Sequence, residues 1–156
     1  MSRRILAVAL LTLIPLPTAL AQESCDRWST GDTGTGQTMA SICTGPVDKQ
    51  SELMIMCGGT NKLSLRYLPF REQEPEPNSS FKVNWTVAGE TISLSMDYEA
   101  DDGALAAYPA ISDRVVELLK TAGSIKAASA DGKYGPDEFT LAGSSKAIAA
   151  VRKSCP

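Results

Sequence analysis

The stretch "SELMIMCGGTNKLSLRY", residues 51–67, decides the predicted fold. Apolar side chains alternate along both of its halves, and in the second half they alternate with Lys62, Ser64 and Arg66. This alternation is typical of strands with one buried face. The segment between the halves, "GGTN", has the chemistry of a hairpin turn. We therefore expect two antiparallel strands whose buried faces carry Leu53, Ile55, Cys57, Leu63, Leu65 and Tyr67.

A second hairpin is predicted over residues 81–98, where apolar and polar residues again alternate. Its buried faces are expected to carry Phe81, Val83, Trp85, Val87, Ile92, Leu94, Met96 and Tyr98. The segment between the hairpins, "PFREQEPEPNSS" at 69–80, contains three prolines and three glutamates and is expected to be an exposed loop. Upstream, we expect a short strand at 39–43 and an irregular segment or hairpin tip at 22–38, which is rich in Gly and Thr.

One helix is predicted in the middle of the chain, after a polar break at 99–110. It is expected to begin near Pro109, because proline fits an early helical position. Short strands are expected after it, at 124–129 and 138–143. The apolar stripe of this helix would consist of Ile111, Val115, Leu118 and Ala122.

A second helix is predicted at the C-terminus. It is expected to start at an N-cap Ser144 and to bury Ile148, Val151 and Cys155 on one face. The fold class is therefore mainly β with α (α+β). We expect a small antiparallel β-sandwich or curved sheet with one central helix and a C-terminal helix that is disulfide-bonded to the sheet.

Four cysteines, Cys25, Cys43, Cys57 and Cys155, can form two disulfides in three possible connectivities. Cys57 has the inward parity of its strand, and Cys155 lies on the buried stripe of the last helix. These directions favour a Cys57–Cys155 bridge and leave Cys25–Cys43 as the second pair. Chain-entropy estimates give about 4–5 kcal/mol for the first, longer loop and about 3 kcal/mol for the second.

Residues 1–21 have the layout of a secretory signal peptide. Arg3 and Arg4 precede a short apolar run, and Ala19-Leu20-Ala21 offers a cleavage site. The run is too short to span a bilayer, so no stable membrane span is expected after cleavage. We expect a single disulfide-stabilised domain, 22–156, in the periplasm or outside the cell. Because the leader carries two arginines and no acid, cleavage changes the net charge from −3 to −5, which argues against a nucleic-acid partner.

Catalytic chemistry is poorly represented. The chain has no histidine, which excludes Ser-His-Asp and Cys-His relays and imidazole metal sites. The cysteines form no C-x-x-C pair, so we expect neither a metal nor a cofactor. Carboxylates acting on a glycan are the remaining catalytic option, but acidic turns are usually only solvated and no catalytic residue is assigned. The candidate carboxylates are Asp97, Glu99, Asp101, Asp102, Asp137 and Glu138.

Trp28 is the residue to examine for a role in binding. It lies in the irregular segment, whereas Tyr67, Trp85 and Tyr98 have inward strand parities and are expected to pack in the core. An exposed Trp28 would therefore mark a binding surface.

Three parts of the chain resemble small exported proteobacterial proteins: Trp28, "LMIMCGGTNKLSLRY" at 53–67 and "FTLAGSSKAIAAVRKSC" at 139–155. The last part is similar to the strand–Gly–Ser–helix–Cys ending of periplasmic accessory proteins associated with type VI secretion. The overall style is also similar to the invasion-associated locus B family. The resemblance implies a β-sandwich-like domain without enzymatic activity that acts through protein contacts in the envelope. It carries no functional residue over to this chain.

The leading functional hypothesis is a non-catalytic exported domain that binds another protein in the envelope or in a host. One alternative is an inhibitor of a cell-wall hydrolase, in which the acidic "REQEPEP" loop meets a basic enzyme. Two further alternatives are a carboxylate-dependent glycan hydrolase and a carrier of a small apolar ligand.

Overall fold

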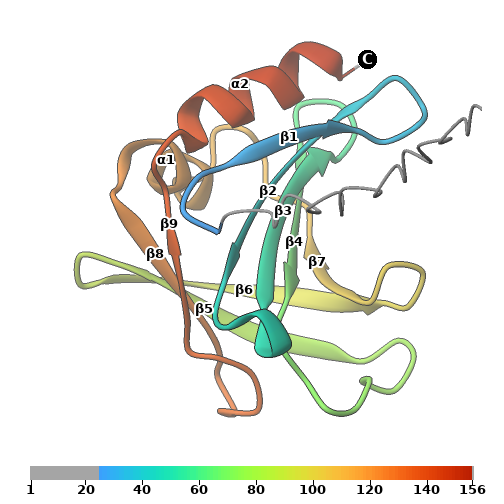
Figure 1. Ribbon diagram of the computed structural model, residues 1–156, viewed down its shortest axis with the longest axis vertical. Helices are drawn as coiled ribbons and strands as arrows, with labels where there is room; N and C mark the ends of the chain where they lie inside the picture. Colours follow the sequence, from blue (N-terminus) through green and yellow to red (C-terminus); the bar gives the residue numbers. More distant parts are fainter. Residues whose placement is uncertain (1–24, 156) are drawn as a thin grey trace, which may run out of the picture.

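The computed structural model describes residues 25–155, so the predicted signal peptide lies outside the described residues. Within this range the chain forms nine strands, two α-helices and one 3-10 helix (Figure 1). In chain order these are β1 (Ser29–Asp32), β2 (Thr38–Thr44), η1 (Val47–Lys49), β3 (Ser51–Cys57), β4 (Leu63–Leu68), β5 (Ser80–Val87), β6 (Glu90–Glu99), β7 (Ala104–Ala107), α1 (Arg114–Thr121), β8 (Ser124–Ser129), β9 (Asp137–Thr140) and α2 (Ser144–Ser154).

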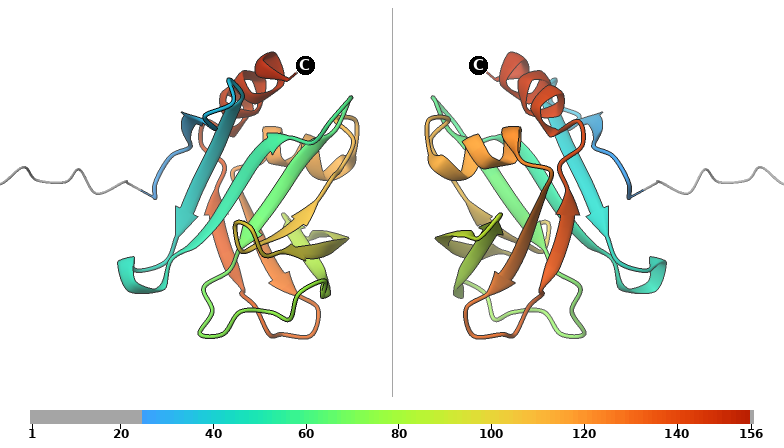
Figure 2. Two further views of the ribbon diagram at one scale, coloured as in Figure 1. Left: turned by 90° about the vertical axis from the view of Figure 1, so that its right-hand side faces the viewer. Right: turned by 90° about the vertical axis from the view of Figure 1, so that its left-hand side faces the viewer.

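All nine strands belong to one antiparallel sheet with the order β1-β2-β3-β4-β7-β6-β5-β8-β9. The mainly β fold is thereby confirmed, and of the two predicted arrangements the strands adopt the curved sheet. The β5–β6 hairpin runs across the direction of β2–β4, and β9 comes into contact with β2 (Figure 1). Both helices lie at one end of the molecule, and the β4–β5 and β8–β9 loops lie at the other (Figure 2).

Aromatic side chains fill the interior of the curved sheet. Tyr67 and Trp85 have no exposed surface, and their rings meet edge to face with centroids 5.8 Å apart. Phe139 lies against Tyr67 at 6.2 Å. Both predicted hairpins therefore point their apolar parity inward, and the helices close the core with residues such as Leu119 and Ile148.

The first helix begins at Arg114, so the predicted start near Pro109 is wrong. The chain around Pro109 instead stays extended beside β4. Leu63 N donates to Pro109 O at 3.0 Å, and Ile111 N donates to Asn61 O at 3.0 Å. These hydrogen bonds require extended backbone, which delays the helix until they end.

Two strands lie in segments that were predicted to be irregular. β7 lies in the expected polar break at 99–110, and all four of its residues are buried. Its two edges pair with β4 and β6, and because side chains on both of its faces are buried it shows no alternation. β1 lies within the Gly- and Thr-rich segment, contains no buried residue and owes its structure to pairing with β2.

Candidate functional site

A groove with a volume of about 520 Å³ separates the start of β1 from the N-terminal half of α2. We call it the Trp28 groove. The residues that determine its character are Arg27, Trp28, Thr30, Gly143, Lys146 and Ala147.

Trp28 forms the aromatic wall of this groove. The side chain is half-buried, packs against the hydrophobic core and also lines the groove. Its indole Nε1 donates a hydrogen bond of 3.2 Å to the carbonyl oxygen of Thr140, at the end of β9. This bond fixes the orientation of the ring, so the groove has a rigid apolar wall.

The opposite wall is the first half of α2, where the side chains are small. Ala147 and Ala150 line the groove together with Gly143, which leaves room beside the indole. Gly143, with a φ of 90°, occupies the N-cap position that was predicted for Ser144, and Ser144 is instead a buried first residue of the helix. The first turn of α2 contains no acidic residue, so the positive end of the helix dipole is not compensated there.

The groove carries two basic side chains, Arg27 and Lys146, which come from opposite ends of the chain. Both are exposed, and neither forms an ion pair with another residue of the range 25–155. Asp26 also lines the groove. In a protein with a net charge of −3, this is a surface suited to an anionic group that lies beside an apolar one.

Both disulfides hold the walls of the groove to the sheet. Cys25 is bonded to Cys43, with Cα atoms 4.6 Å apart, and this bridge anchors the chain just before Trp28. Cys57 is bonded to Cys155, with Cα atoms 5.6 Å apart, and this bridge anchors the end of α2 to β3. The structure therefore contains both predicted pairs.

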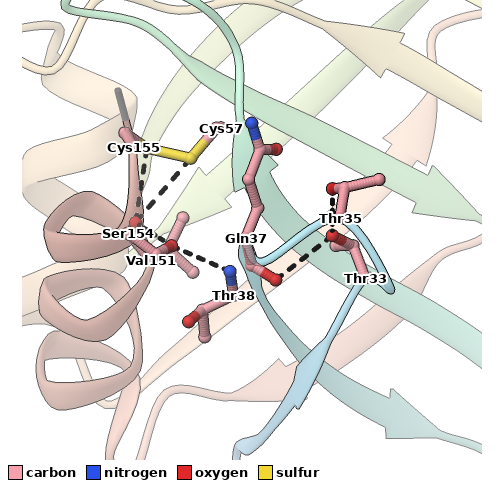
Figure 3. Close-up of a disulfide and its surroundings, with 8 residues drawn as sticks. All are labelled: Thr33, Thr35, Gln37, Thr38, Cys57, Val151, Ser154 and Cys155. Atoms are coloured by element: carbon pink, nitrogen blue, oxygen red, sulfur yellow. Dashed lines mark hydrogen bonds between the residues drawn. A yellow bond between two sulfur atoms is a disulfide. The ribbon is translucent and has the colours of Figure 1, made fainter.

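Hydrogen bonds add to the anchor at the end of α2 (Figure 3). The Ser154 hydroxyl accepts a 2.8 Å bond from Thr38 N and donates a 2.8 Å bond to Val151 O. The helix is thus joined to the first residue of β2 as well as to β3. A ligand in the groove would meet two walls that are both fastened to one sheet.

The candidate carboxylates do not form a catalytic pair. The structure brings Glu99 and Asp102 together, but around Arg66, whose Nη2 lies 2.6 Å from an oxygen of each. Burial by itself lowers the pKa of Arg66, but the hydrogen bonds that Arg66 donates to Asp102 and Glu99 outweigh burial and raise this pKa. Both carboxylates are ion-paired with this one guanidinium and so have a structural partner. This cluster therefore fastens the β6–β7 turn to β4.

The other candidate carboxylates are dispersed. Asp137 accepts a hydrogen bond from the buried Tyr67, and Glu138 lies on the outside of β9, 3.7 Å from Lys126. Asp97 and Asp101 are exposed. The sequence had no signal for the burial of Arg66, which has the polar parity of its strand and only 8% exposure. No pattern in the sequence indicated that Arg27 and Lys146 share a groove, because only the fold brings them together.

In the described part of the chain, no group of three or more His, Cys, Asp or Glu side chains could hold a metal ion. None of the helices in residues 25–155 is long and apolar enough to cross a membrane. No family model, no curated protein and no solved structure matches this chain.

Proposed function

We propose that this protein is an exported, non-catalytic domain that binds a segment of another protein in its Trp28 groove. The observation that carries the proposal is a groove with a rigid aromatic wall and two basic side chains. The non-catalytic part is supported by two of the candidate carboxylates, Glu99 and Asp102, which are ion-paired with Arg66. Two disulfides and the signal-like residues 1–21 support export to the periplasm or beyond the cell. The partner would then be a protein of the envelope or of a host.

The chemistry of the groove indicates which segments fit. Trp28 offers a flat apolar surface for an aromatic or proline side chain. Arg27 and Lys146 attract carboxylates, and the small residues of α2 let a backbone approach closely. The volume of about 520 Å³ is large enough for a few side chains. An acidic peptide segment with one aromatic residue therefore suits this site best.

Fluorescein-labelled heptapeptides test the proposal. One set places a single aromatic residue among Glu and Asp, and a matched set replaces these acids with Lys. Anisotropy titrations with mature protein should show saturable binding of acidic members only. Trp28→Ala and Lys146→Gln should each weaken binding at least about fivefold, which corresponds to about 1 kcal/mol.

Lys153→Gln is the matched control, because Lys153 lies in the last turn of the same helix and does not line the groove. It should leave the affinity unchanged. The proposal fails if no acidic peptide binds saturably, or if the Lys146 and Lys153 variants lose affinity equally. Circular dichroism of each variant checks that the fold is retained.

A second candidate function, inhibition of a basic cell-wall hydrolase, is favoured by the anchored acidic loop between β4 and β5. Arg71 donates to Glu74 Oε2 and to the carbonyl oxygen of Gly103, and Tyr98 donates to the same Glu74 oxygen at 2.6 Å. Pro75 is buried. This anchored loop leaves Glu72 and Glu76 exposed, and a preorganised acidic loop binds a basic surface with little loss of entropy.

Assays of basic peptidoglycan hydrolases separate this candidate from the first. Inhibition by the mature protein should be lost in a Glu72→Gln/Glu76→Gln variant and kept in Trp28→Ala. Glu117→Gln, on a helix at the other end of the molecule, is the control. Absence of inhibition across a panel of basic wall hydrolases, or unchanged inhibition by the double variant, contradicts this candidate.

A further inference from the structure

β6 is paired on both sides along only part of its length. It pairs with β5 from Glu90 to Asp97, but with β7 only from Asp97 to Glu99. β7 ends at Ala107, and the chain then leaves to bond with β4. β6 therefore continues well past the end of β7 toward the β5–β6 turn (Figure 1). Among the strands of residues 25–155, those that pair with residues 91–95 lie on one side only.

The open side of this segment presents unbonded backbone groups. Tyr98 N donates to Ser79 O, on the β5 side. Because the direction alternates along an antiparallel strand, Thr91, Ser93 and Ser95 direct their N–H and C=O groups away from β5. Within residues 25–155, no hydrogen bond from another segment reaches these groups, and all three residues are exposed.

Proteins usually protect such edges with charged side chains, proline or a bulge. The segment "TISLS" at 91–95 has no charge and no proline, and Thr91 and Ile92 are β-branched. The nearby Glu90 is already paired with Arg114, at 2.8 Å. This edge is therefore competent to accept a further strand.

We propose that the open edge of β6 pairs with the same edge of a second copy of the chain, antiparallel and about a two-fold axis at Ser93. In this register Ser93 faces the partner's Ser93, and Thr91 faces the partner's Ser95. All of these residues direct their backbone groups outward, so each pair exchanges two hydrogen bonds, as an antiparallel ladder requires. The same patch serves both copies, as a two-fold interface requires.

The side chains are also self-complementary in this register. Ile92 faces the partner's Leu94 on the half-buried face, while hydroxyl groups meet on the exposed face. The flanking acids do not oppose each other, because Glu90 faces the partner's Met96 and Asp97 faces the partner's Gly89. A segment with these pairings favours a second copy over an unrelated strand. None of its residues lines the Trp28 groove, so the dimer leaves both grooves open.

Analytical ultracentrifugation of the mature protein over about 1–200 µM tests this proposal, with a concentration-dependent monomer–dimer equilibrium as the expected result. Ser93→Lys and Ser93→Glu should each weaken dimerisation at least tenfold, because each places like charges together at the two-fold axis. Mixing the two variants should restore a dimer, because the ammonium group of one variant then faces the carboxylate of the other across the axis. Gly31→Lys, an exposed change on the edge strand β1 where an added Cβ meets nothing within 4 Å, should leave the equilibrium unchanged.

Hydrogen exchange supplies a readout at the edge itself. The amides of Thr91, Ser93 and Ser95 should exchange rapidly in dilute protein and gain protection as the dimer forms. A wild-type chain that stays monomeric at about 200 µM, the top of that range, overturns the proposal. The proposal is also overturned if the dimer dissociation constant is the same in wild type and in both charged variants. A mixture of the two variants that dimerises no better than either variant alone overturns it as well.

Discussion

Tyr67 on β4 donates a hydrogen bond from its hydroxyl group to the carboxylate of Asp137 on β9, a strand that is not its neighbour in the sheet. Tyr67 has no exposed surface, so this bond crosses the interior of the curved sheet and links its two halves. A carboxylate that was a catalytic candidate in the sequence therefore has a structural partner.

Tyr67→Phe should lower the free energy of unfolding by about 1–2 kcal/mol, because it removes one hydrogen bond and leaves Asp137 without its interior donor. Urea unfolding measures this loss. Tyr108→Phe is the matched control: Tyr108 also donates to a carboxylate, that of Glu99, but it is 46% exposed and should cost less. Equal losses would show that the interior position of the Tyr67 bond is unimportant.

The same hydroxyl should make the protein sensitive to alkali. Burial, and then the hydrogen bond and charge of Asp137, raise the pKa of Tyr67 above its ordinary value of 10.0. The folded state therefore holds this proton more tightly than the unfolded state does. The contribution of this proton to the free energy of unfolding is fully present below about pH 10 and is lost as the pH rises further. Unfolding free energies between about pH 8 and 11.5 should fall more steeply above about pH 10 in wild type than in Tyr67→Phe, and parallel curves would contradict this.

The two disulfides should contribute unequally to stability. The Cys57–Cys155 bridge spans 98 residues and the Cys25–Cys43 bridge spans 18. Replacing the first pair with alanines should lower the unfolding free energy by about 4–5 kcal/mol, and replacing the second by about 3 kcal/mol, because the longer loop restricts the unfolded chain more. Denaturant titrations of the two double variants measure both losses in unfolding free energy. A larger loss for the shorter Cys25–Cys43 loop would refute the prediction.

Arg66→Met should be more damaging than Arg114→Met. The first change leaves Glu99 and Asp102 close together without their cation, which we expect to cost about 1–2 kcal/mol after allowing for the partial exposure of both carboxylates. Arg114 is exposed and pairs with Glu90 and Glu117 at the surface, where solvent screens the charges, so its loss should destabilise the protein less than the loss of Arg66. Thermal and urea unfolding compare the variants, and similar losses would mean that the Arg66 cluster does not anchor the β6–β7 turn.

Gly58, at the β3–β4 turn, cannot be enlarged without moving the backbone. A Cβ atom there would lie 2.6 Å from the carbonyl oxygen of Leu63. Gly58→Ala should therefore cost about 1–3 kcal/mol. Gly31→Ala, for which the new atom meets nothing within 4 Å, should change stability by less than about 0.5 kcal/mol. Equal unfolding midpoints for the two variants would contradict the close approach.

The sequence by itself determined the two hairpins and the buried stripe of α2, and among three possible connectivities it favoured the two disulfides that the structure contains. These features follow from local periodicity, because a strand buries every second residue and a helix buries one stripe. Cys57 at the end of β3 and Cys155 just after α2 are half-buried and pack against the core, so the same periodicity indicated their directions before their proximity was known.

Only the tertiary structure decided β1, β7 and the start of α1. Their conformations depend on hydrogen bonds to distant segments, as when Pro109 accepts from Leu63, and no local pattern encodes such bonds. The same holds for the two surfaces that we propose to bind partners. Arg27 and Lys146 come together only because α2 returns to β1, and the edge at Ser93 is open only because β7 is short. Periodicity specifies which side of an element is buried, whereas the folded chain specifies what lies next to the side that remains exposed.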